Sequence, residues 1–293
     1  MNDRVYKGRT LATVDNWLDN ATQELTKANT PSARLDAELL LGYMLGVSRT
    51  WLIAHGDDSL HATALHHKGS TRRGSLIEHG DELLLKRLKR LPIAYITGHK
   101  EFYGRDFVVT KDTLIPRPET EALVDIAKKH KFSGRLLDVG TGSGSLGLTL
   151  ALETDSKLTV SDVSEATLDV ARKNAKILGV KPVHFVSSDL LQHWLEHEAP
   201  KPFDVIASNL PYVDPAWKDT SPELAHEPYI ALYAADGGLA LIKKLIDQAP
   251  RLLVTDGYLL LEADPTQHDA IATYATNFHE VERQDYALLL QKT

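Results

Sequence analysis

The sequence has no cysteine among its 293 residues. The chain therefore forms no disulfides, binds no metal through thiolates and uses no thiol nucleophile. It also has no apolar run near the roughly 20 residues that a membrane-spanning helix needs. The first residues, Met1-Asn2-Asp3-Arg4, lack the apolar core of a secretory signal peptide. These absences predict a cytoplasmic protein with no membrane partner.

An excess of basic residues is missing too, since 33 Lys and Arg stand against 40 Asp and Glu and the formal net charge is −7. Proteins that bind nucleic acid stably usually have a basic balance or a basic patch. No stable nucleic-acid partner is therefore expected. The hydrophobic content, 43%, is ordinary for a globular protein. A chain of this length accommodates one small and one medium domain, and we expect it to be a monomer.

Residues 1–92 carry helical patterns and few strand signals. Apolar residues recur at spacings of three and four in residues 32–46, and residues 81–91 form a second amphipathic segment that ends at Pro92. An earlier helix is expected over residues 10–27. Together these segments predict a small helical domain over residues 1–92.

Histidine is concentrated between these helices, around a segment at residues 61–80 that contains Gly69 and Gly74. A metal site is one interpretation and a solvated loop is the other. The loop is favoured, because no cysteine and no tight acidic cluster accompanies the histidines. No metal is therefore expected, and the role of the segment stays open. The histidines of this region are His55, His61, His66, His67 and His79.

Residues 93–118 have a different character. Residues 93–96 and 107–109 are rich in residue types that favour strands, and Gly98 and Gly104 punctuate them. They predict a β-hairpin that links two domains. Pro116 and Pro118 then stiffen the chain and exclude a helix at that point. A helix is expected to follow over residues 120–130.

Residues 119–293 show alternating strand and helix patterns, which are typical of βαβ units. They predict an α/β domain with a Rossmann-like, mostly parallel sheet that helices cover on both faces. The tail adds two strands that meet near Gln284 and Asp285. The expected strands cover residues 135–139, 158–161, 183–186, 203–207, 258–262, 278–283 and 286–291. The expected helices cover residues 145–153, 165–178 and 239–249.

A glycine-rich loop follows the first of these strands and opens a helix. Gly142, Gly144 and Gly147 fit the dinucleotide-binding fingerprint, and Asp162 lies where an acid can bind a ribose hydroxyl. This pattern alone does not choose between cofactors. Asp138 favours S-adenosylmethionine, because a carboxylate before the loop repels a pyrophosphate but suits the ammonium and sulfonium groups of that cofactor.

The sequence Asn209-Leu210-Pro211-Tyr212 follows the fourth expected strand. A planar NH2 group is a poor nucleophile, because its lone pair is delocalised. The Asn209 side-chain oxygen and the Leu210 main-chain carbonyl can each accept one of its N–H bonds, and Pro211 favours an extended Leu210. Tyr212 can pack flat against the group. We therefore interpret these residues as the catalytic site of methyl transfer to a planar NH2 group, which works mainly by positioning.

With these motifs in place, the sequence resembles the PrmC/HemK family, the N5-glutamine methyltransferases of peptide chain release factors. The resemblance covers nearly the whole chain and is carried by residues 34–40, 92–98, 101–104 and 114–121. It implies a class I S-adenosylmethionine-dependent methyltransferase domain and a helical N-terminal domain that engages the release factor. The methyl acceptor would be the glutamine of a Gly-Gly-Gln loop, so the activity would support translation termination.

The motifs and the resemblance together give three groups of candidate site residues. The cofactor group is Asp138, Gly140, Thr141, Gly142, Ser143, Gly144, Asp162, Asp189, Leu190 and Asn209, with Asp162 at the ribose and Asp189 with Leu190 at the adenine. The catalytic group is Asn209, Leu210, Pro211 and Tyr212. The substrate would contact this same group and also Arg117, Pro118 and Glu119.

Leu210 departs from the family, which usually has a proline there. Asn-Leu-Pro-Tyr is also the form found in ribosomal RNA adenine dimethyltransferases, so an adenine-N6 methyltransferase acting on RNA or DNA is the alternative function. The net charge of −7 and residues 114–121 favour the protein substrate. Two further alternatives are a nicotinamide-dependent oxidoreductase, which Asp138 disfavours, and a domain that binds release factor without turnover.

Overall fold

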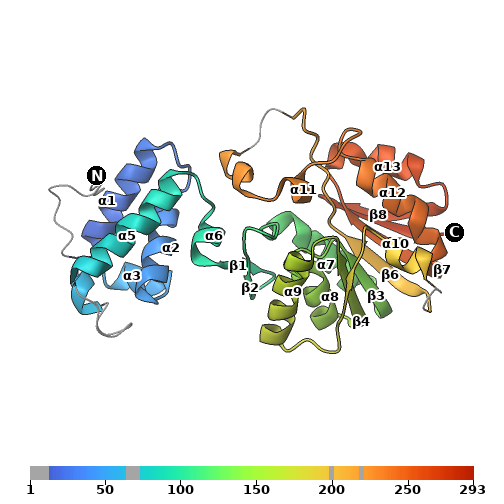
Figure 1. Cartoon of the computed structure of the whole chain (residues 1–293), viewed down its shortest axis with the longest axis horizontal. Coiled ribbons are helices and arrows are strands. Elements are labelled where there is room, and N and C mark those ends of the chain that lie inside the picture. Colours follow the sequence, from blue (N-terminus) through green and yellow to red (C-terminus); the bar gives the residue numbers. More distant parts are fainter. Residues whose placement is uncertain (1–12, 64–72, 198–200, 218–220) are drawn as a thin grey trace. The chain divides into compact units, whose positions relative to one another are not determined.

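The computed structural model describes residues 13–63, 73–197, 201–217 and 221–293, with the backbone alone described for residues 73–78. The chain divides into two compact units, residues 1–98 and residues 99–293 (Figure 1). Each unit contains its own hydrophobic core. None of the helices in the described part of the chain is long and apolar enough to cross a membrane.

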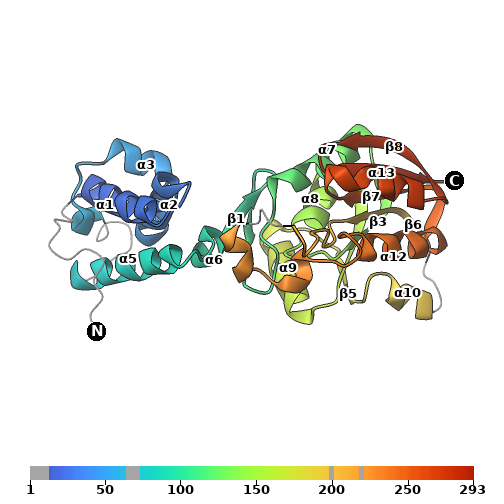
Figure 2. The same cartoon turned by 90° about the horizontal axis from the view of Figure 1, so that it is seen from above.

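The first unit is a bundle of helices. Thr13 caps the first helix, because its side-chain oxygen accepts a hydrogen bond from the Asn16 main-chain N–H at 3.2 Å. The apolar faces meet in a core around Trp17, Leu41 and Leu84, with α5 packed along α1 and α2 (Figure 2). The helices are α1 (Val14–Lys27), α2 (Ala33–Leu45), α3 (Arg49–Ala54), α5 (Arg73–Leu88) and α6 (Ile93–Thr97).

Two buried acids of residues 34–40 are paired inside this bundle. Asp36 on α2 accepts a hydrogen bond from Arg87 on α5 at 2.6 Å, and each side chain is 6% exposed. Glu38 accepts hydrogen bonds from Arg34 at 2.9 Å and from Arg49 at 2.7 Å. Burial raises the pKa of Glu38, but the two arginines prevail and lower it. This motif therefore connects three helices of the first unit.

The prediction of a loop over residues 61–80 is wrong at both ends, because residues 61–63 are helical and α5 already begins at Arg73. Gly80 lies inside the helix, where a Cβ atom would lie 2.9 Å from Trp17 Nε1. Close packing therefore outweighs the low helix propensity of glycine. His66 and His67 lie outside the described residues. Within the described ranges no group of three possible metal ligands occurs.

Residues 93–96 are helical, so the prediction of a strand there is wrong. Their side chains favour strands locally, but Pro92 stands at the N-cap of α6 and Gly98 ends the helix in the left-handed conformation. The predicted hairpin is confirmed further along the chain, in the second unit. It consists of β1 (His99–Phe102) and β2 (Arg105–Val108), which pair antiparallel.

The second unit is built on a seven-stranded sheet in the order β5-β4-β3-β6-β7-β9-β8. Strands β3 to β7 run parallel to one another, whereas β9 runs antiparallel to both β7 and β8. This confirms the mostly parallel sheet that the alternating pattern predicted. The strands are β3 (Ser133–Val139), β4 (Asp155–Asp162), β5 (His184–Ser187), β6 (Phe203–Ser208), β7 (Leu253–Glu262), β8 (Phe278–Gln284) and β9 (Ala287–Lys292).

Helices cover both faces of this sheet (Figure 1). Successive strand residues enter different cores: Leu136 of β3 packs with the α7–α9 side, and Leu137 packs with the α10–α13 side. One face carries α7 (Glu121–Lys129), α8 (Ser145–Glu153) and α9 (Glu165–Leu178). The other carries α10 (Gln192–Glu196), α12 (Ala240–Gln248) and α13 (His268–Tyr274). The short elements are α11 (Tyr229–Leu232), η1 (Pro118–Thr120), η2 (Pro222–His226), η3 (Ala249–Arg251) and η4 (Pro265–Gln267).

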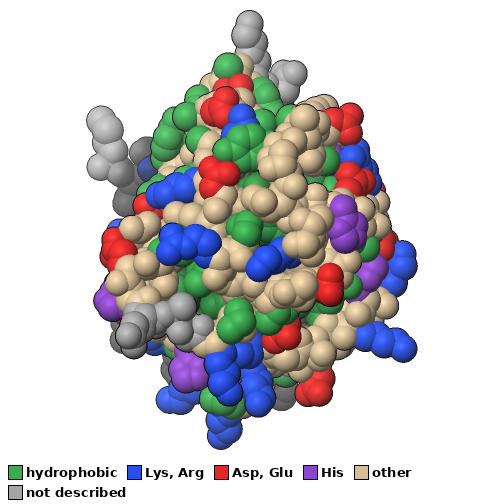
Figure 3. All heavy atoms as spheres, turned by 90° about the vertical axis from the view of Figure 1, so that its right-hand side faces the viewer, with side chains coloured by type: hydrophobic (Ala, Val, Ile, Leu, Met, Phe, Trp, Pro, Cys, Tyr) green, Lys and Arg blue, Asp and Glu red, His purple; other side chains and the backbone are tan. Residues whose placement is uncertain are grey.

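The charged surface is mixed on the face that Figure 3 shows. Lys and Arg side chains lie interspersed with Asp, Glu and apolar side chains. This mixture agrees with the small negative net charge of the sequence, −7.

Candidate active site

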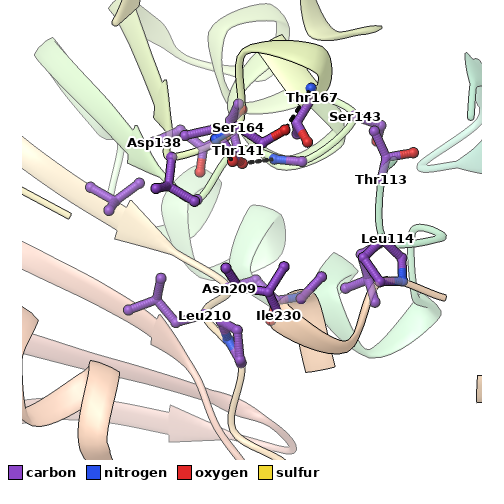
Figure 4. Close-up of a pocket in the computed structure, with 18 of the residues that line it drawn as sticks. Thr113, Leu114, Asp138, Thr141, Ser143, Ser164, Thr167, Asn209, Leu210 and Ile230 are labelled. Atoms are coloured by element: carbon purple, nitrogen blue, oxygen red, sulfur yellow. Dashed lines mark hydrogen bonds between the residues drawn. The ribbon is translucent and has the colours of Figure 1, made fainter. Parts of the chain in front are cut away.

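A cavity of about 540 Å³ opens at the carboxyl ends of β3, β4 and β6. The chain proceeds from β3 to β4 and β5 on one side of the sheet and later returns through β6 on the other. The cavity therefore lies at the topological switch point, where α/β sheets bind ligands. Figure 4 shows Asn209, Leu210 and Ile230 on one side of it, across from Ser164 and Thr167.

The glycine-rich loop forms one wall of this cavity. Gly140, Gly142 and Gly144 have positive φ angles of 71°, 56° and 84°, which glycine adopts without strain. The main-chain N–H groups of Gly140 and Thr141 both donate to the Ser161 carbonyl at 2.9 Å, and this joins the loop to β4. Residues 140–143 line the cavity. Gly144 is not among the lining residues and instead stands at the start of α8.

Asp138 lies in β3 and is fully buried. Its Oδ2 accepts hydrogen bonds from Thr141 Oγ1 at 2.6 Å and from the Gly147 N–H at 3.0 Å. Its Oδ1 has no hydrogen-bond partner in the described structure, although Asp138 lines the cavity. Burial raises the pKa of Asp138 to about 6, against the effect of the two hydrogen bonds. A buried carboxylate with one free oxygen suits a cationic group of a ligand.

The two other predicted cofactor acids also line the cavity. Asp162 accepts a hydrogen bond from the Gly142 N–H at 3.1 Å, and burial raises the pKa of Asp162. Asp189 is more exposed, and its Oδ2 forms an ion pair with Lys244 of α12 at 2.6 Å. Leu190 is buried beside it, with a φ angle of 50°. One oxygen of Asp189 thus has a partner in the protein already.

Asn209 follows β6 and lines the cavity. Its Nδ2 donates a hydrogen bond to Thr120 Oγ1 at 3.0 Å. Because Nδ2 is engaged, Oδ1 is the atom of Asn209 that remains to accept a hydrogen bond from a ligand. Sequence reasoning missed this hydrogen bond, because the two residues are 89 positions apart and belong to different motifs.

Leu210 and Pro211 line the cavity as well, but Tyr212 does not. The Leu210 side chain is 5% exposed and packs in the core against Gly140. It therefore fills space, while its main-chain carbonyl accepts no hydrogen bond from the described residues. The Tyr212 hydroxyl points to Glu262 and donates to its Oε1 at 3.1 Å.

Glu262 is a site residue that sequence reasoning missed. It ends β7 and is 1% exposed. Burial raises the pKa of Glu262 to about 7, while the polar side chains of Thr120, Tyr212 and Asn209 lower it. The sequence did contain a signal for this residue, because Glu262 is an acid at the end of an apolar strand, just as Asp162 is at the end of β4.

A buried carboxylate, Glu227, fixes the segment at residues 114–120. Its Oε2 accepts a hydrogen bond from the Ile115 N–H at 3.0 Å, and its Oε1 accepts one from the Arg117 guanidinium at 2.5 Å. The Glu227 side chain is 1% exposed. These bonds connect two segments that are more than a hundred positions apart in the sequence and that both border the cavity.

The three residues of this segment that are predicted to contact the substrate lie outside the cavity lining. Arg117, Pro118 and Glu119 are absent from the cavity lining, to which Pro116 and Thr120 belong. Pro118 and Glu119 are exposed at the surface. Arg117 contacts Glu227, so the structure gives it a structural partner.

Asn174 of α9 is a further residue that the sequence did not single out. It is fully buried and makes three hydrogen bonds to the main chain. Two join it to the N–H and carbonyl of Val108, each at 2.9 Å, and one joins it to the Ser143 carbonyl at 2.8 Å. Asn174 thus fixes the glycine-rich loop to the β1–β2 hairpin.

Comparison with known proteins finds two matching family models and relatives of similar length. The family model described as PrmC N-terminal domain matches residues 16–98, and the model described as Methyltransferase small domain matches residues 118–228. A release factor glutamine methyltransferase of Escherichia coli is 35% identical over 281 residues, which are 92% of this chain and 94% of that one. Another, of Koribacter versatilis, is 37% identical over 280 residues, again 92% and 94%.

The strand order, the single reversed strand and the cavity at the switch point define a class I S-adenosylmethionine-dependent methyltransferase fold. Within this class, the identity over nearly the full length of both chains decides the family. The chain belongs to the release factor glutamine methyltransferase family.

Proposed function

We propose that this protein transfers a methyl group from S-adenosylmethionine to the side-chain amide nitrogen (N5) of the glutamine in the Gly-Gly-Gln motif of peptide chain release factors. The observation that carries the proposal is the position of Asn209. Its Nδ2 is bound by Thr120, and it borders the same cavity as the glycine-rich loop. An amide oxygen beside a cofactor-binding loop is what a planar NH2 acceptor requires.

The cavity residues fit S-adenosylmethionine. The free Oδ1 of Asp138 would pair with a cationic group of the methionine part, the glycine-rich loop at residues 140–144, of which residues 140–143 line the cavity, would hold that part, and Asp162 would bind the ribose. Asp189 and Leu190 border the adenine. Once bound, this cofactor supplies a methyl group on a sulfonium, and the chemistry needs no metal.

The catalytic residues act mainly by holding the acceptor. Asn209 Oδ1 and the Leu210 carbonyl each accept one N–H of the glutamine amide, which favours lone-pair density on the nitrogen. Pro211 and Tyr212 keep this loop in shape, with the Tyr212 hydroxyl bound to Glu262. A strong base is unnecessary, because the nitrogen can lose its proton after it has gained the methyl group. Arg117, Pro118 and Glu119 contact the release factor outside the cavity.

The regions of the chain divide this work. Residues 1–92 engage the release factor, residues 93–118 connect, and residues 119–293 carry out the transfer. The protein acts in the cytoplasm as a monomer, without a stable nucleic-acid partner.

The decisive experiment is mass spectrometry of the release factor after incubation with the protein and S-adenosylmethionine. One added methyl group on the Gly-Gly-Gln glutamine is expected. Asn209→Ala should abolish this methylation and retain cofactor binding in calorimetry. Methylation of adenine in RNA or DNA, with an unmodified release factor, would establish the alternative function. Retained turnover in Asn209→Ala would contradict the role of this residue.

A further inference from the structure

Glu262 is a buried acid that the proposed mechanism leaves without a role of its own. It is 1% exposed and lies at the carboxyl end of β7. Its Oε1 accepts the Tyr212 hydroxyl at 3.1 Å, while its Oε2 is buried and has no hydrogen-bond partner within the described ranges. A buried polar atom of this kind is costly unless something requires it.

Thr120 lies between this acid and Asn209. It is 3% exposed, and its Oγ1 accepts the Asn209 Nδ2–H at 3.0 Å. A hydroxyl that accepts a hydrogen bond still has its own hydrogen to donate. The Thr120 and Asn209 side chains both lower the pKa of the Glu262 carboxyl, so the polar groups of both lie near it. The unpartnered Oε2 of Glu262 is the acceptor at hand.

The direction of this chain of hydrogen bonds decides how the Asn209 amide is turned. An ionised carboxylate only accepts hydrogen bonds, so it favours a Thr120 hydroxyl that turns its hydrogen toward Glu262 and its oxygen toward Asn209. The NH2 end of Asn209 then faces Thr120, and the oxygen end faces the cavity. The opposite rotation would place the Asn209 oxygen against Thr120, whose single hydrogen would be turned toward Glu262, and near the negative charge of that acid.

We propose that Glu262, acting through Thr120, is a positioning residue that fixes the rotation of the Asn209 amide, so that its oxygen receives the N–H of the methyl acceptor. The inference rests on the proposed function and adds to it a carboxylate that touches neither cofactor nor substrate. It gives the Thr120 hydroxyl a role that threonine and serine fulfil and that valine, of equal size, does not.

The first test compares Thr120→Val with Thr120→Ser in the full chain, with the release factor as substrate. Thr120→Val leaves Asn209 free to rotate, so kcat should fall by about 100-fold, as expected for a misplaced catalytic group. The dissociation constant for S-adenosylmethionine, measured by calorimetry, should not change. Thr120→Ser should restore most of kcat. A Thr120→Val enzyme with wild-type kcat, or a Thr120→Ser enzyme as slow as Thr120→Val, would overturn the inference.

The second test is Glu262→Gln, which keeps the shape and removes the charge. Its kcat should be lower than that of the wild type, with little change in KM. The wild-type kcat should fall as the pH drops through about 7, where Glu262 gains a proton, and the variant should lack this dependence. The other titratable groups that face Glu262 are Glu119, Tyr212 and Tyr286, and they are unchanged in the variant. Identical pH profiles for the two enzymes would contradict the inference.

The outcomes separate this inference from the proposed function. A wild-type enzyme that leaves the release factor glutamine unmodified defeats both. A wild-type enzyme that methylates it, together with Thr120→Val and Glu262→Gln enzymes of unchanged kcat, defeats only the role of Glu262 and Thr120.

Discussion

At the scale of single residues, the site depends on acids that the fold keeps out of water. Asp138 and Glu262 are almost completely buried, and burial raises the pKa of both, to about 6 and about 7. Within the described residues, the hydrogen bonds that these two acids accept come from hydroxyl groups and a main-chain N–H, and none comes from a basic side chain. Asp138 lines the cavity, and a perturbed acid in a cavity is a common mark of function, because a purely structural position would favour a neutral side chain.

Glu262→Gln should therefore change stability in a pH-dependent way. The pKa of Glu262 is raised from 4.5 to about 7 on folding, so the stability linked to its proton is present at low pH and lost as the pH rises through about 7. Relative to the variant, the wild type should lose about 2 kcal/mol of unfolding free energy between about pH 5 and about pH 8. Urea denaturation at the two pH values measures this difference. A parallel response of both proteins would show that the acid is solvated.

Asp138→Asn should weaken cofactor binding without unfolding the protein, because the two side chains have the same shape. Loss of a charged partner for a cationic group should raise the dissociation constant roughly 10- to 100-fold at about pH 8. The wild-type affinity should fall as the pH drops through about 6, where Asp138 becomes protonated, and the variant should show no such fall. Calorimetry over this range tests both points, and equal affinities would rule out Asp138 as a contact.

At the scale of elements, side chains that bond to the main chain hold separate segments together at the cavity. Asn174 does so for α9, the hairpin and the glycine-rich loop. The expected helices over residues 145–153 and 165–178 are confirmed at α8 and α9, because their apolar spacing and their flanking glycines specify them locally. Sequence alone could not show that Asn174, on the second of these helices, would reach two other segments.

Asn174→Ala should destabilise the second unit by about 3 kcal/mol, because it leaves three buried main-chain groups without a partner. Lys173→Ala is the matched control, since Lys173 is the exposed neighbour on the same helix. Denaturant unfolding measures both variants, with an unchanged dependence on denaturant concentration as the sign of an intact folded state. Equal midpoints for the two variants would refute the structural role of Asn174.

At the scale of the whole molecule, the chain consists of two units with separate cores. The alternating pattern was enough to predict the sheet of the second unit, and helical periodicity was enough for most of the first. The candidate site was predictable only in part. Asp138, Asp162 and Asn209 could be singled out, because they lie at or just after the ends of strands in recognisable motifs. The contacts made by Thr120, Glu227 and Glu262 join distant motifs, and no local pattern encodes such contacts.

Separation of the units provides a test of how the work is divided. A protein of residues 99–293 retains both cores of the second unit and the whole cavity lining. It should bind S-adenosylmethionine with the affinity of the full chain. Its KM for the release factor should rise by at least about 10-fold, as expected when part of a binding surface is removed. An unchanged KM would show that residues 1–98 make no contribution to substrate binding.

The hydrogen bonds of Glu227 limit which amino-acid substitutions this protein can accept at positions 117 and 227 during evolution. One of its partners is a guanidinium, but the other is the main-chain N–H of Ile115, which every residue except proline carries. Exchange of the charges, Arg117→Glu with Glu227→Arg, would restore an ion pair but would turn a donor toward that N–H. Substitutions can therefore remove this ion pair, but they cannot exchange its two charges, because position 227 must keep an acceptor for the Ile115 N–H.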